Sequence, residues 1–193
     1  MTTEGIKVYV LKPLDDPWGD YGNILVHGMT RHLDKSESLL QLERTAPFIP
    51  LVSMPGIHDV VVTDDVRNKL IHAIPSIYFA PIKKARIVRL EWEQWDRSFP
   101  EPLAYPESGE PEDYILGLEH DPALAEQLGQ LWQLVPKITP NIQINGKFNA
   151  AAYHREHFVC ADDFGGYAYI SAELKFVLST IAAEFVGFEE IRA

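Results

Sequence analysis

Two stretches of the chain, residues 60–82 and 168–191, share one order of apolar and polar positions. Each begins with an apolar run, passes through a Ser or Thr into apolar residues spaced three and four apart, and ends in a second apolar run. This pattern predicts a strand, a capped amphipathic helix and a second strand. The matched positions are Thr63 with Ser171, Asp65 with Glu173, Val66 with Leu174, and Leu70 with Leu178. We therefore expect two related strand–helix–strand lobes.

Shorter elements are predicted around these units. Alternating apolar and polar residues in Ile6–Leu11 and Arg86–Trp92 indicate strands. Between them, Asp34 or Ser36 is a suitable cap for a short helix that ends near Glu43. That stretch is ambiguous, and the helix is the interpretation that the caps favour.

Proline and glycine divide the remaining segments. Pro13–Gly22 is predicted to be a loop in which Trp18 and Tyr21 form a lid over the core. Tyr114–Leu118 predicts a short strand, and Pro122 suits the first turn of a helix. The apolar residues expected on that helix are Leu124, Leu128, Leu131 and Trp132.

The fold class predicted is α+β, with two similar strand–helix–strand lobes packed as one compact unit. A length of 193 residues suits a single domain, 1–193. The alternative division is into two lobes, about 1–92 and 114–193, joined by an acidic, proline-rich excursion.

The composition of the chain indicates the class of protein and its cellular compartment. The chain is 46% hydrophobic and 23% charged, as in ordinary folded soluble proteins. It has no apolar run of the roughly 20 residues that span a bilayer, and its first residues do not resemble a secretory signal. Cys160 is the single cysteine, which excludes an internal disulfide. We expect a cytoplasmic protein without a membrane partner.

The net charge of −11 is concentrated in one segment. Glu91 to Glu126 contains eleven acids and one base, Arg97, and so contributes −10 of that total. Such a field repels nucleic-acid phosphates and attracts basic proteins over about 8–10 Å in physiological salt. The two interpretations are a solvated loop that maintains solubility and an interaction surface for a basic partner.

The most concentrated candidates for catalytic or metal chemistry are His154, His157 and Cys160. Two histidines at this spacing suit a metal on a helix, and a cysteine near a histidine suits a nucleophile–base pair. The run leads into an apolar strand, however, where residues three apart point to opposite faces. We therefore expect no catalytic residue, metal site or cofactor, and a structural role for all three.

Aromatic residues lie within the acidic segment. Trp92 and Trp95 lie near its start, and Phe99, Tyr105 and Tyr114 follow among the acids and prolines. Either tryptophan could belong to the core or to an interface. Because aromatics anchor interfaces while acids steer basic partners, this segment is the candidate binding surface. The candidate partner-binding residues are Trp95, Asp96, Glu107, Glu110, Glu112 and Asp113.

Two parts of the chain resemble a known family. Val61–Leu70 followed by Tyr78–Ile82, and Tyr169–Lys175 followed by Gly187–Glu189, are similar to patterns in immunity proteins of bacterial polymorphic-toxin and contact-dependent competition systems. The resemblance covers about the last two-thirds of the chain, and residues 1–55 lie outside it. It implies a small cytoplasmic protein that binds one cognate toxin, and it carries over no catalytic residues.

The function predicted is therefore an immunity protein, not an enzyme, that occludes the active site of a cognate toxin with a basic surface. Two alternatives remain open: a small cytosolic hydrolase using His154, His157 and Cys160, and an acidic scaffold or regulatory binding protein. The sequence does not indicate the oligomeric state or the chemistry of the toxin.

Overall fold

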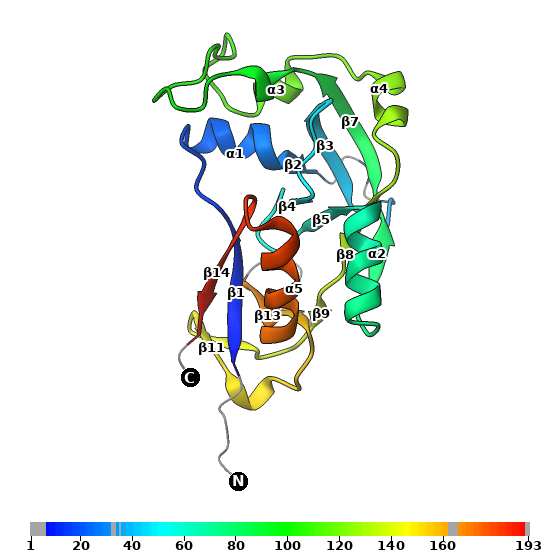
Figure 1. Ribbon diagram of the computed structural model, residues 1–193, viewed down its shortest axis with the longest axis vertical. Coiled ribbons are helices and arrows are strands. Elements are labelled where there is room, and N and C mark those ends of the chain that lie inside the picture. Colours follow the sequence, from blue (N-terminus) through cyan, green and yellow to red (C-terminus); the bar gives the residue numbers. More distant parts are fainter. Residues whose placement is uncertain (1–6, 32–33, 35, 162–165, 192–193) are drawn as a thin grey trace.

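The computed structural model describes residues 7–31, 34, 36–161 and 166–191, which form an α+β fold (Figure 1). The strands are β1 (Val8–Pro13), β2 (Met29–Thr30), β3 (Gln41–Ala46), β4 (Val52–Ser53), β5 (Val60–Thr63), β6 (Phe79–Pro81), β7 (Lys83–Arg89), β8 (Leu131–Leu134), β9 (Lys137–Ile138), β10 (Gln143–Ile144), β11 (Lys147–Phe148), β12 (Phe158–Cys160), β13 (Ala168–Ser171) and β14 (Val186–Glu190). The α-helices are α1 (Asp20–His27), α2 (Asp64–Ala73), α3 (Asp113–Leu116), α4 (Pro122–Gln127) and α5 (Ala172–Ala182). Two 3₁₀ turns are η1 (Trp92–Gln94) and η2 (Ala150–Ala152).

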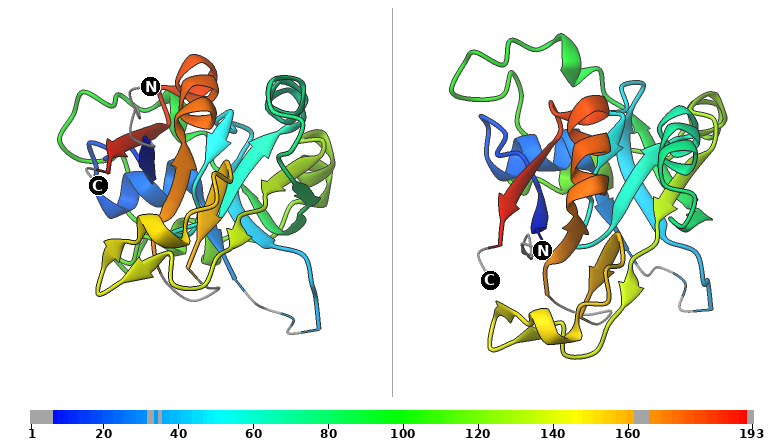
Figure 2. Two further views of the ribbon diagram at one scale, coloured as in Figure 1. Left: turned by 90° about the horizontal axis from the view of Figure 1, so that it is seen from below. Right: turned by 60° about the horizontal axis from the view of Figure 1, so that its bottom comes forward.

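The strands form three sheets and a hairpin. One sheet has the order β14-β1-β13-β12-β9, a second has the order β4-β5-β8-β6, and a third has the order β2-β3-β7. The hairpin pairs β10 with β11. Figure 2 shows α2 and α5 on one side of the strands and the β10–β11 hairpin on the opposite side.

The two predicted strand–helix–strand units are confirmed, as β5-α2-β6 and β13-α5-β14. In each unit a strand from elsewhere in the chain lies between the two strands and runs antiparallel to both. This inserted strand is β8 in the first unit and β1 in the second. The two strands of each unit are therefore parallel, and the helix crosses over the inserted strand.

The strand registers of the two units correspond position by position. Thr63, the last residue of β5, lies opposite Leu131, and Ser171, the last residue of β13, lies opposite Val8. Three residues further along the inserted strands, Leu134 lies opposite Phe79, and its counterpart Leu11 lies opposite Phe188. The repeat therefore includes β8 and β1, which share an aromatic residue, Trp132 or Tyr9, followed two positions later by a leucine.

A cation over an aromatic ring also recurs. The Arg67 guanidinium lies 4.0 Å from the ring centroid of Trp132 on β8. Lys175, at the matching position of α5, has its Nζ 5.8 Å from the ring centroid of Tyr9 on β1. Trp132 and Tyr9 occupy the same place on the two inserted strands, opposite Val62 and Ile170 respectively.

The two units share one core. Val66 and Leu70 of α2 belong to the same buried cluster as Leu174 and Leu178 of α5, and all four are 0% exposed. Each of the two predicted lobes, about 1–92 and 114–193, contributes a strand to the sheet of the other. β1 pairs with the strands of the second unit, and β8 pairs with those of the first.

The two helix N-termini differ in their capping. The Ser171 hydroxyl accepts a hydrogen bond from the Leu174 N–H at 3.2 Å, as expected for an N-cap. Thr63 occupies the same position but makes no such bond. Asp64 beside it accepts a hydrogen bond from Trp132 Nε1 at 2.8 Å, which links the start of α2 to β8.

The prediction of a helix that ends near Glu43 is wrong. Residues 41–46 form β3, paired with β2 and β7, and the helix in this region is α1 instead. Every residue of β3 is buried, including its polar and charged ones. The strand therefore lacks the alternation of apolar and polar residues by which a strand is predicted. The Glu43 side chain is 1% exposed and lies 3.5 Å from Arg31 and 3.6 Å from Arg86, two partly exposed side chains. Ion pairs to a buried carboxylate therefore replace the usual apolar alternation.

Two further element predictions require correction. The predicted strand at Tyr114–Leu118 is the short helix α3, because Tyr114 and Ile115 both turn inward. The helix beginning at Pro122 ends at Gln127, and Leu131 and Trp132 belong to β8 instead.

Candidate partner-binding loop

The candidate site is the segment 95–113, which we call the acidic loop. It follows η1 and ends where α3 begins, on the connection between β7 and α4. In Figure 1 it projects beside α1 and α3, at the end of the molecule away from the β10–β11 hairpin. The loop is therefore connected to the sheet that contains β3 and β7.

Two tryptophans form the base of the loop. Trp92 is 2% exposed, and its Nε1 donates a hydrogen bond to Thr45 Oγ1 at 3.0 Å. Trp92 is therefore part of the core. Trp95 is half-buried and packs against Trp18, at a centroid distance of 5.9 Å, and against Tyr114, at 6.0 Å. It supports the loop from within.

Side chains from outside the loop hold its backbone in place. Trp18 Nε1 donates to the Phe99 carbonyl at 3.0 Å, and the Tyr21 hydroxyl donates to the Gly109 carbonyl at 2.5 Å. Arg97 forms an ion pair with Asp16, whose side chain is 4% exposed. Asp16 and Trp18, which precede α1, thus hold the start of the loop, and Tyr21 of α1 holds the part near its end. Trp18 is buried, as expected for a lid.

Three apolar side chains of the loop face solvent. Phe99 is 61% exposed, Leu103 is 78% exposed and Tyr105 is 48% exposed. Tyr105 stacks edge-on against Tyr21, with 5.0 Å between ring centroids, so its ring is held while one side stays open. Exposed apolar side chains gathered on one ordered loop are typical of interaction surfaces.

Carboxylates surround these apolar side chains. Among the residues that the structure describes, none of the loop's six carboxylates forms an ion pair within 4.0 Å. They are Asp96, Glu101, Glu107, Glu110, Glu112 and Asp113. The Ser98 hydroxyl and backbone N–H donate to Asp96 and lower the pKa of that carboxyl. Desolvation, together with the nearby Glu101 charge, raises the pKa of Tyr105.

The six predicted binding residues fall into two groups. Asp96, Glu107, Glu110 and Glu112 are exposed on the loop, and Asp113 is partly exposed at the start of α3. Trp95 instead packs inward. The exposed Leu103 was missed, and Phe99 and Tyr105 were recognised among the aromatics of the segment but were left out of the predicted binding residues. The available signal was apolar residues standing alone between prolines.

The three candidates for catalytic or metal chemistry have different surroundings. Cys160 is 0% exposed in β12, and His154 is exposed. His157 Nδ1 lies 3.0 Å from Ser171 Oγ and 3.7 Å from a Glu173 oxygen. Both contacts use the same ring nitrogen, whereas a nucleophile–base–acid relay uses both nitrogens. In the described part of the chain, no group of three or more His, Cys, Asp or Glu side chains is placed to hold a metal ion.

Comparisons of the chain with protein families, with curated proteins and with solved structures find no match. Within the described ranges, none of the helices has the length and apolar character needed to cross a bilayer.

Proposed function

We propose that this chain is an immunity-type binding protein that neutralises a cognate protein toxin with a basic surface, and that the acidic loop is its binding surface. The observation that carries the proposal is the combination, in one segment, of exposed apolar side chains, a backbone held by hydrogen bonds, and carboxylates that have no ion-pair partner among the described residues. The resemblance of residues 61–82 and 169–189 to bacterial immunity proteins supplies the class of partner.

Each feature of the acidic loop has a separate physical role in this proposal. The carboxylates raise the rate of encounter with a basic partner, an effect that salt screens. Phe99 and Leu103 lose exposed apolar area when the partner covers them, which stabilises the complex by roughly 25 cal/mol per Å² before ordering costs. The bonds from Trp18 and Tyr21 hold the loop in place beforehand, so less conformational entropy is lost on binding.

The toxin is neutralised because the acidic loop occupies its active site. A toxin that acts on nucleic acid or another anionic substrate presents basic side chains around its active site. Carboxylates placed against those side chains exclude the substrate while satisfying the same charges. The acidic loop projects from the molecule, so it can enter a concave site without displacing the repeat units.

The alternatives lead to different expectations. An acidic scaffold or regulatory protein uses the same loop but gives no protection against a toxin. A hydrolase using His154, His157 and Cys160 requires activity that disappears in His157→Ala. Of the two, the scaffold shares the observations that favour the immunity function, because it needs the same exposed loop.

The experiment is co-expression with the toxic domain encoded by the neighbouring gene, scored as growth of a bacterial host. Protection is expected from the wild type and expected to be lost in Leu103→Ala combined with Phe99→Ala. A matched charge variant neutralises the loop acids Glu107, Glu110, Glu112 and Asp113, and its control neutralises four exposed acids elsewhere. The control acids are Asp65, Glu126, Glu173 and Glu184. Equal protection by the loop variants and the control would show that the acidic loop is not the binding surface.

A further inference from the structure

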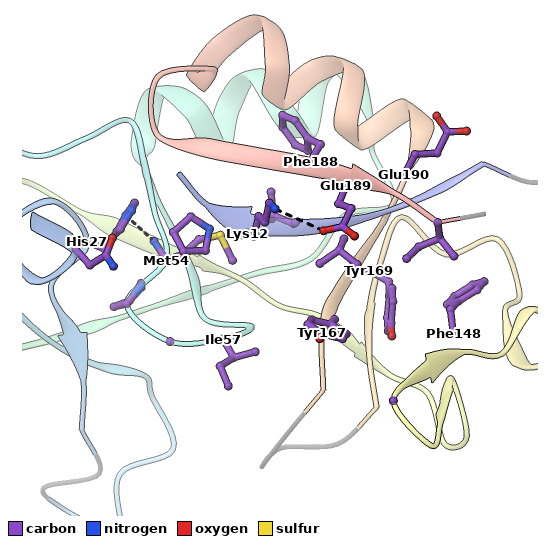
Figure 3. Close-up of a pocket in the computed structure, with 18 of the residues that line it drawn as sticks. Lys12, His27, Met54, Ile57, Phe148, Tyr167, Tyr169, Phe188, Glu189 and Glu190 are labelled. Atoms are coloured by element: carbon purple, nitrogen blue, oxygen red, sulfur yellow. Dashed lines mark hydrogen bonds and ion pairs between the residues drawn. The ribbon is translucent and has the colours of Figure 1, made fainter. Parts of the chain in front are cut away.

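A second surface, remote in sequence from the acidic loop, lies on the five-stranded sheet. It is an open groove of about 1580 Å³ between β1, β13 and β14, helix α1, the segment after β4 and the β10–β11 hairpin (Figure 3). Ile57, Phe148, Tyr167 and Tyr169 contribute apolar and aromatic surface. Small-molecule pockets usually measure about 300–1,000 Å³, so this groove suits a length of polypeptide better than a compact ligand.

One rim of the groove is a free sheet edge. β14 pairs with β1 on one side and with no described strand on the other, and Figure 1 shows it at the margin of the molecule. The Ile191 N–H donates to the Val8 carbonyl at 2.9 Å, which makes these two residues a hydrogen-bonded pair. Because such pairs alternate along an antiparallel ladder, Glu189 and Gly187 also bond toward β1. The backbone N–H and C=O groups of Phe188 and Glu190 therefore point to the free edge.

The side chains of this edge are acidic. Glu189, on the face of the groove, forms an ion pair with Lys12 at 3.5 Å (Figure 3). Glu190, on the opposite face, is exposed and forms no ion pair with any described residue. Two copies of a chain with net charge −11, joined at this edge, would place these carboxylates close together. Charge complementarity thus favours a basic segment over a second copy.

A buried histidine contributes to one end of the groove. His27 is 3% exposed and lines the groove, and its Nδ1 accepts a hydrogen bond from the Met54 N–H at 3.2 Å. An accepting Nδ1 leaves the proton of the neutral ring on Nε2. Nε2 has no hydrogen-bond partner among the described residues. The neutral His27 ring is thus held beside Met54 as part of the groove lining.

We propose that the free edge of β14 and the adjoining groove bind an extended segment of a partner polypeptide, which adds to the sheet as a further strand. The segment has alternating basic and apolar residues. Its apolar side chains lie on the groove face, and its basic side chains lie on the opposite face beside Glu190. Backbone hydrogen bonds to Phe188 and Glu190 provide the pairing. This site does not depend on the acidic loop or on the identity of a toxin.

The probe is a fluorescein-labelled, end-capped hexapeptide, Lys-Val-Lys-Phe-Lys-Val, followed by fluorescence anisotropy. Glu190→Gln keeps the edge N–H and removes the charge, and is expected to weaken binding a few-fold at low salt. Glu190→Pro also removes the outward N–H, and is expected to weaken binding more than tenfold. Proline is tolerated where a strand N–H faces solvent, so this variant keeps the fold, as checked by circular dichroism.

Two N-methylated peptides separate strand pairing from charge attraction. Each carries methyl groups on alternate amides, so that one peptide blocks the amides that face β14 and the other blocks those that face away. Strand addition predicts that only one of the two loses binding, and that amide hydrogen exchange at Phe188 and Glu190 slows when the unmodified peptide binds. Any of three results would overturn the proposal, whether or not Glu190→Pro folds. They are equal binding by both methylated peptides, no binding of the unmodified peptide, and amide exchange at Phe188 and Glu190 that the unmodified peptide does not slow.

Discussion

Replacement of the buried His27 is expected to change how the stability of the protein depends on pH. His27 is 3% exposed, on α1, and its Nδ1 accepts a hydrogen bond from the Met54 N–H. Desolvation by burial, assisted by the positive charge of Arg44, lowers the pKa of His27 to about 4. His27→Gln removes the titrating ring and retains a side-chain oxygen that can accept the Met54 N–H.

The magnitude follows from linkage between protonation and folding. The imidazole has a pKa of 6.5 in the unfolded chain and about 4 in the folded chain, so below pH 6.5 the unfolded state binds more protons. The stability associated with neutral His27 is therefore fully present above pH 6.5 and is lost as the pH falls toward 4. Each pH unit in this window corresponds to about 1.4 kcal/mol, which gives a loss of about 2 kcal/mol at pH 5.

The assay is urea unfolding of the wild type and of His27→Gln at pH 7.5 and pH 5. Other titrating groups contribute equally to both proteins, so the difference between their unfolding free energies isolates His27. This difference should shift by about 2 kcal/mol in favour of the variant at pH 5. His154→Gln removes an exposed imidazole and controls for the substitution itself. A difference that is the same at both pH values would show that folding does not lower the pKa of His27.

Three further predictions concern the repeat units and the single cysteine. Ser171→Ala should lower the free energy of unfolding by about 1 kcal/mol and Thr63→Ala by clearly less, because only Ser171 caps its helix through its side chain; chemical denaturation of both variants compares them. Leu178→Ala should cost about 2–5 kcal/mol in the same measurement, since this side chain is fully buried between the two units; a loss below 1 kcal/mol would contradict the shared core. Cys160 should react with a thiol reagent only at the rate of unfolding, because its side chain is 0% exposed; rapid labelling of the native protein would contradict its burial.

The repeat could be predicted from the sequence because its signals are local. Helical spacing from Val66 to Leu70 and from Leu174 to Leu178 defines two amphipathic helices, and the apolar runs beside them define strands. The strands inserted into each unit could not be assigned this way. β8 and β1 pair with strands that lie far away in sequence, so no local pattern indicates where they belong.

The strand β3 shows a second reason for failure. Glu43 and Arg44 are 1% and 0% exposed in a strand that is buried on every side, whereas charged residues normally indicate solvent. Arg44 is retained by carbonyl acceptors, including Val26 and Phe48, rather than by a carboxylate. Such compensation depends on tertiary contacts, so the polar sequence suggested a surface helix.

The acidic loop could be located from its charge, but the orientation of its aromatic residues could not be predicted. Trp95 turns inward because Trp18, 77 positions earlier in the numbering, provides a surface for it. With that space filled, Phe99 and Leu103 remain outside. Charge patterning thus located the acidic loop, while the orientation of its apolar side chains depended on a long-range contact.

The proposed function requires that the acidic loop binds a basic toxin. Its most direct test is the association rate with the purified toxic domain, measured for the wild type, for the variant neutral at Glu107, Glu110, Glu112 and Asp113, and for Leu103→Ala. The neutral variant is expected to associate more slowly at low salt and to approach the wild type at high salt, while Leu103→Ala is expected to dissociate faster at both. Folded variants whose association and dissociation rates equal those of the wild type at both salt concentrations would show that the acidic loop does not bind the toxin.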